Sequence, residues 1–225
     1  MPAPSYRPPP WLPGPHLQTI WPATLAPCPS IAWRRERWAT PDGDFVDVDF
    51  AGPTLPGTSR GARRPLPIHA GAADPALSGA PLLVLFHGLE GNSGSHYARA
   101  LADAALRRGW SVAVPHFRGC SGELNRAPRA YHSGDSTEID WMLRRFARMG
   151  GPASAIAAVG VSLGGNVLLK WLGEQREAAG FVRAAVAVSP PQDLHASAVA
   201  LSRGFNLAYT RHFLRSLKRA ALAKL

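Results

Sequence analysis

The chain contains 225 residues, which suits one domain, because a domain commonly has about 100–200 residues. Hydrophobic residues form 46% of it. This excludes a protein that is disordered throughout, since disorder requires low hydrophobicity together with high net charge. The net charge of +10 at pH 7 raises nucleic acid as a partner, but the arginines are scattered and no zinc-finger or RNP signature accompanies them. We therefore expect no nucleic-acid partner.

The sequence shows no clear signal for secretion, for a membrane-spanning helix or for a cofactor site. The apolar runs fall far short of the ~20 residues that span a bilayer, and residues 1–14 contain no continuous apolar stretch of a secretory signal. We expect no transmembrane segment and a cytoplasmic location. The two cysteines, Cys28 and Cys120, are too few for a disulfide framework or a cysteine zinc site. No metal or organic cofactor is predicted.

The first 30 residues contain ten prolines. This density predicts an extended arm with no regular helix, because proline lacks a backbone N–H and clashes with the preceding turn of a helix. Apolar side chains, including Trp11, Leu12 and Trp21, interrupt the prolines. We therefore expect residues 1–30 to form an arm that is docked on a domain.

Residues 33–50 are predicted to form a β-hairpin. Pro-Asp-Gly at residues 41–43 is a turn sequence, and apolar and acidic residues alternate over residues 46–50. Residues 51–80 are rich in Gly, Pro, Ala and Arg without any hydrophobic period. They predict a mobile surface loop.

From residue 82 onward, short apolar runs alternate with longer helical patterns. The runs lie at residues 82–86, 110–115, 155–161 and 184–188, and the helical patterns at 95–108, 135–149 and 163–178. This alternation is typical of βαβ units, whose strands are buried on both faces. The predicted fold class is α/β, with a mostly parallel sheet that follows the N-terminal antiparallel hairpin.

Ser162 stands where the third of these runs meets its helix, in the sequence Gly160-Val161-Ser162-Leu163-Gly164. Gly-x-Ser-x-Gly between a strand and a helix is typical of the nucleophile elbow, a sharp turn that exposes the serine hydroxyl. The flanking glycines are needed because the two backbones approach closely. We predict that Ser162 is a catalytic nucleophile, and the competing interpretation is a turn serine without chemistry.

The first run ends in a second candidate loop, His87-Gly88-Leu89-Glu90-Gly91. In open α/β sheets the carboxyl ends of the strands lie at one edge, where ligands bind. We therefore predict that the backbone N–H groups of Leu89 and Leu163 form an oxyanion hole. The competing interpretation of His87 and Gly88 is a tight turn only.

The second run ends in residues 116–123, which we expect to border the same pocket. Arg118 is expected to hold this loop in place, and Cys120 to be a small packed residue. Glu123 is a poor candidate for a catalytic acid, because the acid follows the serine in the chain order of these sheets.

Six stretches, taken together, resemble the YheT-like branch of the α/β-hydrolase superfamily. They are residues 15–19, 41–45, 87–91, 117–123, 131–134 and 160–166, and residues 51–80 depart from the pattern. The resemblance implies an α/β-hydrolase fold and a serine carboxylesterase or acylglycerol lipase. Such an enzyme acts through an acyl-enzyme on Ser162, on short- to medium-chain esters or acylglycerols, or transfers the acyl group to an alcohol.

A serine hydrolase of this fold needs an acid and then a histidine after the nucleophile. After Ser162 the chain offers few candidates: Glu174, Glu177, Asp193, His195 and His212. The resemblance implies that the acid and the histidine lie on later strands that this chain does not contain. We therefore expect a truncated sheet with an uncovered edge, an incomplete core at residues 31–192, and only the start of a helical cap at residues 193–225.

Three alternatives remain beside an esterase with impaired activity. Asp193 and His212 could complete a dyad with Ser162. The chain could instead be a non-catalytic fragment or a ligand-binding relative that keeps the pocket. Residues 206–225 are predicted to be helical, and the basic amphipathic segment at residues 211–224 could contact anionic lipid. The expected partner is a small ester or lipid-like substrate, and the sequence leaves the oligomeric state open.

Overall fold

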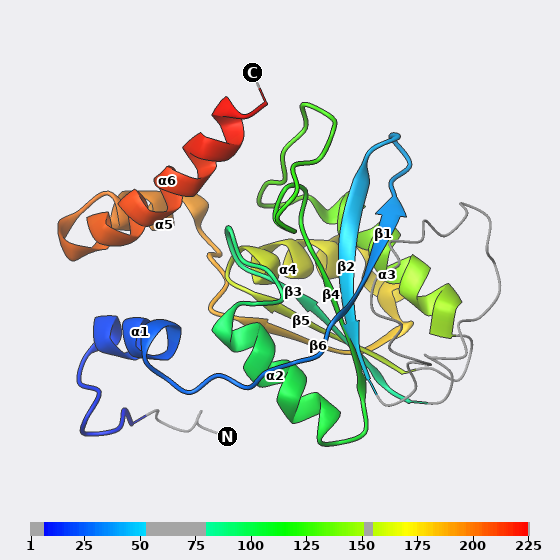
Figure 1. Ribbon diagram of the computed structural model, residues 1–225, viewed down its shortest axis with the longest axis horizontal. Coiled ribbons are helices and arrows are strands. Elements are labelled where there is room, and N and C mark those ends of the chain that lie inside the picture. The colour runs from blue at the N-terminus through cyan, green and yellow to red at the C-terminus, as the bar shows by residue number, and fades with distance from the viewer. Residues whose placement is uncertain (1–6, 53–79, 151–154, 225) are drawn as a thin grey trace.

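The computed structural model describes residues 7–52, 80–150 and 155–224, and Figure 1 shows their arrangement. Most of the loop expected at residues 51–80 lies outside the described residues. Six strands form one mixed sheet in the order β1-β2-β4-β3-β5-β6. In chain order these strands are β1 (Arg34–Ala39), β2 (Phe45–Ala51), β3 (Leu82–Phe86), β4 (Ser111–Pro115), β5 (Ile156–Val161) and β6 (Val182–Val188).

The pairing of the strands confirms the predicted fold class. β1 and β2 form the expected antiparallel hairpin, with Ala39 opposite Phe45 beside the turn. β2 also runs antiparallel to β4, whereas β3 lies parallel to β4 and β5, and β6 lies parallel to β5. The sheet is therefore mostly parallel with an antiparallel hairpin at its N-terminal side.

Helices cover the two faces of this sheet. α2 (His96–Leu106) packs on one face with Leu83 and Leu85. α3 (Ser136–Gly150) and α4 (Leu163–Gln175) pack on the other face with Val84 and Phe86 (Figure 1). Successive residues of a strand point to opposite faces, so alternate residues of β3 supply two separate hydrophobic clusters. Because both faces are covered, β3 is buried along its whole length and its sequence is a continuous apolar run.

β6 differs from the inner strands. Most of its residues are exposed, and Val186 and Val188 have 53% and 41% of their surface accessible. Within residues 7–52, 80–150 and 155–224, β5 is its only strand neighbour. The expectation of an uncovered sheet edge therefore holds for the part of the chain that the structure describes.

The expectation that the proline-rich arm contains no helix is wrong. Residues Pro15–Thr24 form the helix α1. Pro15 occupies the start of the helix, where the backbone N–H has no partner inside the helix, so its loss there has little effect. Pro22 lies inside the helix near its end, where its missing N–H removes one hydrogen bond. The number of prolines mattered less than their positions.

The arm is docked, as expected, through polar contacts as well as apolar ones. The Arg99 guanidinium donates to the carbonyl oxygens of Cys28 and Pro29 at 3.0 and 2.7 Å. Leu12 is buried, whereas Trp11 remains 60% exposed. Of these two apolar side chains, therefore, Leu12 anchors the arm and Trp11 remains largely in solvent.

The C-terminal segment forms two helices, α5 (Leu194–Leu201) and α6 (Leu207–Leu222), after the carboxyl end of β6 (Figure 1). The sequence predicts α6 but not α5, and neither helix has a buried residue. Two short 3₁₀ segments, η2 (Arg176–Ala179) and η3 (Gly204–Asn206), join the neighbouring elements. Across the described residues, no helix has the length and apolar character needed to cross a membrane.

Candidate active site

Ser162 occupies a sharp turn between β5 and α4. Its backbone has φ of 52° and ψ of −117°, which places a non-glycine residue in a left-handed conformation that is rarely populated. Such strain persists only when the surrounding structure holds it, and it is concentrated at functional sites. The turn leaves the side chain of Ser162 half-exposed at the end of β5.

The glycines around Ser162 are explained by close backbone contacts. A Cβ atom on Gly164 would lie 2.6 Å from the carbonyl oxygen of His87, and one on Gly160 would lie 2.7 Å from the Cα atom of Gly165. Real Cβ atoms do not approach other atoms so closely. The Gly-x-Ser-x-Gly spacing therefore reflects the packing of α4 against β5 and against the end of β3.

The structure brings the loop after β3 against Ser162. A Cβ atom on Gly88 would lie 3.3 Å from the Cβ atom of Ser162. The loop closes a turn in which the N–H of Gly91 donates to the carbonyl oxygen of Gly88 at 2.9 Å. Glu90, inside this turn, has a positive φ of 55°. The loop of residues 87–91 and the turn at Ser162 thus share one edge of the sheet.

The backbone N–H groups near Ser162 differ in their partners. Gly88 N–H donates to Tyr97 Oη and Glu90 N–H donates to Tyr131 Oη, both at 2.9 Å. In contrast, the N–H groups of Leu89 and Leu163 have no hydrogen-bond acceptor within the part of the chain that the structure describes. Leu163 opens α4, where the first N–H groups of a helix have no partner in the helix itself.

His87 is buried and neutral. Its Nε2 atom accepts from the N–H of Phe117 at 3.0 Å, so the proton is on Nδ1, which donates to the carbonyl oxygen of Gly88 at 2.8 Å. Burial lowers the pKa of His87 to about 3. Both ring nitrogens therefore hold the backbone, and neither is available to take a proton from Ser162.

The other buried histidine, His116, also belongs to the scaffold. Its Nε2 atom lies 2.8 Å from Oδ2 of Asp49. Arg35 binds the same carboxylate with two N–H groups, at 2.7 and 2.8 Å. Burial alone would raise the pKa of Asp49, but the hydrogen bonds from Arg35 and His116 hold it well below its usual range. The contact between Asp49 and His116 ties β2 to the end of β4.

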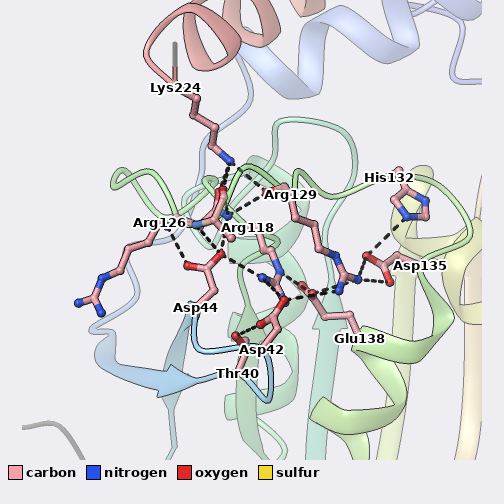
Figure 2. A network of polar contacts seen from close by, with 12 residues as sticks. Thr40, Asp42, Asp44, Arg118, Arg126, Arg129, His132, Asp135, Glu138 and Lys224 are labelled. Atoms are coloured by element: carbon pink, nitrogen blue, oxygen red, sulfur yellow. Dashed lines mark hydrogen bonds and ion pairs between the residues drawn. The ribbon is translucent and has the colours of Figure 1, made fainter.

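Arg118 is buried in the centre of a second group of charges, which we call the Arg118 network (Figure 2). Its members are Asp42, Asp44, Arg118, Arg129, Asp135 and Glu138. The Arg118 guanidinium donates to Glu138 at 2.6 Å and to Asp44 at 3.0 Å. It therefore joins the hairpin turn, the loop after β4 and the start of α3, which agrees with the expectation that Arg118 holds this loop in place.

Two further residues of the loop after β4, Cys120 and Glu123, have contacts away from Ser162. Cys120 packs against the hydrophobic core, and burial, with a further effect of Glu90, raises the pKa of its thiol to about 12. The thiol is therefore protonated near neutral pH and a poor nucleophile. Glu123 pairs with Arg37 at 2.7 Å on the surface.

The candidate acids and bases after Ser162 are not brought together. Asp193 caps α5, where its carboxylate accepts from the N–H of Ala196 at 2.8 Å. His195 and His212 are exposed on α5 and α6. Across the described residues, no hydrogen bond links Asp193, His212 and Ser162. The structure therefore gives no support to a dyad of Asp193 and His212.

Two residues that contact the loop beside Ser162 were not predicted from the sequence. Tyr131 lies in one of the six stretches behind the family resemblance, but the sequence alone does not indicate which backbone group its hydroxyl meets. Tyr97 lies on α2 in no recognised motif. Both contacts depend on how separate segments pack.

Comparison with known proteins agrees with this arrangement. Residues 81–216 match the family model described as "alpha/beta hydrolase fold". The chain is 41% identical over 211 residues to a protein of Escherichia coli strain K12 named Putative esterase YheT, a match that covers 93% of the chain and 55% of the relative. A monoacylglycerol lipase of Saccharomyces cerevisiae is 29% identical over 119 residues, or 52% of the chain and 26% of that lipase.

The chain thus spans about half the length of the E. coli relative and less of the yeast one. Among solved structures, the esterase Pf2001 of Pyrococcus furiosus superposes with a TM-score of 0.51 at 16% identity, covering 78% of the chain and 58% of the esterase. At this identity the likeness concerns the fold alone. The family match, the sheet order and the strand-to-helix turn at Ser162 agree: the chain belongs to the alpha/beta hydrolase fold family, and within it the chain is YheT-like.

Proposed function

We propose that the chain carries the nucleophile of a serine carboxylic ester hydrolase. The observation behind this proposal is the strained turn at Ser162, with φ of 52°, packed against the loop of residues 87–91. A strand-to-helix turn of this kind presents a serine Oγ at the top of the sheet. Structural roles alone would not require a non-glycine residue at this position.

In the proposed reaction, Ser162 Oγ forms a bond to the carbonyl carbon of an ester while its proton passes to a general base. The carbonyl oxygen then carries negative charge in a tetrahedral intermediate. The bond to the leaving alcohol breaks, and the alcohol takes up a proton, which leaves an acyl-enzyme. Water releases the acid from this intermediate, whereas a second alcohol in place of water would give acyl transfer.

The N–H groups of Leu89 and Leu163 are the proposed donors to the oxyanion. Two observations support this role: both groups lack an acceptor among the described residues, and Leu163 follows Ser162 while Leu89 follows Gly88, on which an added Cβ atom would meet the Ser162 side chain. Leu163 also begins α4, whose dipole favours negative charge at this end. Removing one such donor typically lowers the rate about 10²–10³-fold.

Acylglycerols and short- to medium-chain esters are the proposed substrates. Support comes from relatives whose names describe such activities, the yeast monoacylglycerol lipase and a yeast medium-chain fatty acid ethyl ester synthase/esterase, which is 34% identical over 127 residues. The second name includes synthesis of an ester, so acyl transfer to an alcohol is the alternative outcome for the same acyl-enzyme.

The test is covalent labelling of the purified 225-residue chain with a fluorophosphonate ester, read by intact-mass spectrometry. The expected result is a single adduct that is lost in Ser162→Ala and kept in Ser202→Ala, a matched change at an exposed helix end. No adduct on a chain shown to be folded would contradict the proposal that this chain holds a reactive Ser162. It would favour the alternative of a non-catalytic fragment or a ligand-binding relative.

A further inference from the structure

We propose that Tyr97 and Tyr131 are positioning residues that hold the Leu89 N–H in place beside Ser162. This inference rests on the function proposed above, because it concerns how the oxyanion hole of that reaction is kept in shape. Neither tyrosine is assigned to the reacting atoms. Each acts on the peptide backbone on one side of Leu89.

Tyr131 holds the Glu90 side of the turn with two hydrogen bonds. Its hydroxyl oxygen accepts from the N–H of Glu90 at 2.9 Å, and its proton goes to Oε1 of the same residue at 2.6 Å. Both the backbone and the side chain of Glu90 are thereby attached to one hydroxyl group. This matters because Glu90 has a φ of 55°, a conformation that a non-glycine residue keeps only when its surroundings hold it.

Tyr97 holds the opposite side of the turn. Its hydroxyl oxygen accepts from the N–H of Gly88 at 2.9 Å. The same oxygen would lie 2.5 Å from a Cβ atom on Gly91, so it sits directly against both ends of the turn. Tyr97 comes from α2 and Tyr131 from the segment before α3, so two separate elements hold one short loop.

The two contacts explain why the free donor in this turn is Leu89. The N–H groups before and after it are both occupied by tyrosine hydroxyls, and that of Gly91 is used inside the turn. With its neighbours held, the peptide that carries the Leu89 N–H has little freedom to rotate. A fixed donor acts on a developing oxyanion without reorganising at the moment of reaction.

Tyr131 is itself held rigidly. Its ring stacks on the ring of Phe117 with centroids 5.5 Å apart and an angle of 8° between the planes. Phe117 in turn contacts His87 edge to face at 4.7 Å, and its N–H donates to the His87 ring. Burial raises the pKa of Tyr131 above its ordinary value. Its hydroxyl therefore keeps the proton that it donates to Glu90.

The experiment compares Tyr131→Phe and Tyr97→Phe, which remove only the hydroxyl group, with Tyr209→Phe as a matched control. Tyr209 lies on α6 and contacts His16, away from the turn. The rate of fluorophosphonate labelling at Ser162 is measured against reagent concentration. We expect the maximal rate to fall about 10–100-fold in the first two variants, because small displacements of a catalytic group have effects of this size. The concentration for half-maximal rate and the Tyr209→Phe rate should stay unchanged.

A second measurement follows the backbone N–H groups themselves by hydrogen exchange of the ¹⁵N-labelled chain. Tyr131→Phe should speed exchange at Glu90, and Tyr97→Phe should speed it at Gly88, with no change at these positions in Tyr209→Phe. A merely structural role would speed exchange without lowering the maximal labelling rate.

The outcomes separate this inference from the proposed function. Labelling of both tyrosine variants at the wild-type rate would overturn the positioning role and leave the function of Ser162 intact. Failure of the folded wild-type chain to be labelled would overturn the proposed function, and the oxyanion role of Leu89 with it. Unchanged exchange at Gly88 and Glu90 would overturn the hydrogen bonds on which the inference rests.

Discussion

The loop and turn around Ser162 and the Arg118 network are held together by different forces. Around Ser162 the contacts are backbone packing at glycines and hydrogen bonds that join backbone groups to the tyrosine hydroxyls and to the neutral His87. In the Arg118 network the contacts are ion pairs centred on the buried side chains of Arg118, Asp44 and Glu138. Charges in the network are paired with each other, whereas two N–H donors beside Ser162 have no acceptor among the described residues. Paired charges of this kind hold the fold together, whereas reaction chemistry needs groups that are free to meet a substrate.

Gly164→Ala is expected to have the largest effect on the loop and turn around Ser162. The added Cβ atom would lie 2.6 Å from the carbonyl oxygen of His87, and two backbones must separate to admit it. We expect a loss of about 5 kcal/mol in the free energy of unfolding, at the upper end for single substitutions, together with loss of Ser162 labelling. Urea unfolding and intact-mass spectrometry measure the two effects.

Gly173→Ala is the control for this change. Gly173 lies in the same helix with open space around it, and alanine there should stabilise the chain by about 0.5–1 kcal/mol. Equal effects of the two substitutions would show that the packing argument at Gly164 is incorrect.

Arg118→Met tests the network in the same way. It leaves the buried carboxylates of Asp44 and Glu138 without their main cation, and removing one partner of a buried ion pair typically lowers stability by about 3–5 kcal/mol. The labelling rate of the molecules that remain folded should change less than ~2-fold, because Arg118 does not contact Ser162.

The surface pair of Arg107 and Asp103 supplies the control, since Arg107→Ala should lower stability by only about 0.5 kcal/mol. A large fall in the labelling rate of folded Arg118→Met would show that the Ser162 site depends on the Arg118 network.

The pH dependence of stability sharpens the comparison further. Burial raises the pKa of Asp44, but hydrogen bonds from Asn125 and the Arg126 N–H outweigh it and lower the pKa to about 2. The ordinary value is near 4, so this carboxylate stabilises the fold above pH ~4 and the stabilisation is lost as the pH falls toward 2. In Asp44→Asn the free energy of unfolding should fall by about 1 kcal/mol less between pH 5 and pH 2 than it does in the wild type, after solvent screening is allowed for. Urea midpoints measured from pH 5 to pH 2 test it, and parallel curves for wild type and variant would contradict it.

The smallest effect is expected at the end of α6. The Lys224 ammonium donates to Oδ1 of Asn125 at 2.6 Å and to the carbonyl oxygens of Ala127 and Arg129 (Figure 2). Lys224→Met should lower stability by about 0.5–1 kcal/mol and speed hydrogen exchange in α6 without altering Ser162 labelling. Lys218→Met, on the exposed side of the same helix, should leave both quantities unchanged. Similar exchange in the two variants would mean that this contact does not hold α6.

Much of the fold could be predicted from the sequence because its signals are local. The run at residues 82–86 and the strand-to-helix junction at Ser162 lie where the structure has β3 and the start of α4. The hairpin follows from its turn residues and alternation. The number of prolines does not indicate α1, because proline is tolerated at the start of a helix, and the eight residues of α5 carry no strong amphipathic pattern.

The sequence by itself determined the order of the strands and of the helices between them, the turn that presents Ser162 and the glycines that this turn requires. Only the tertiary structure decided which N–H groups near Ser162 are occupied, because the partners of Gly88 and Glu90 come from α2 and from a segment 41 residues away. It also decided that the buried histidines are structural, since His116 meets Asp49 across 67 residues of chain. Periodicity and turn chemistry act between near neighbours, whereas hydrogen-bond partners across a sheet depend on how distant segments pack.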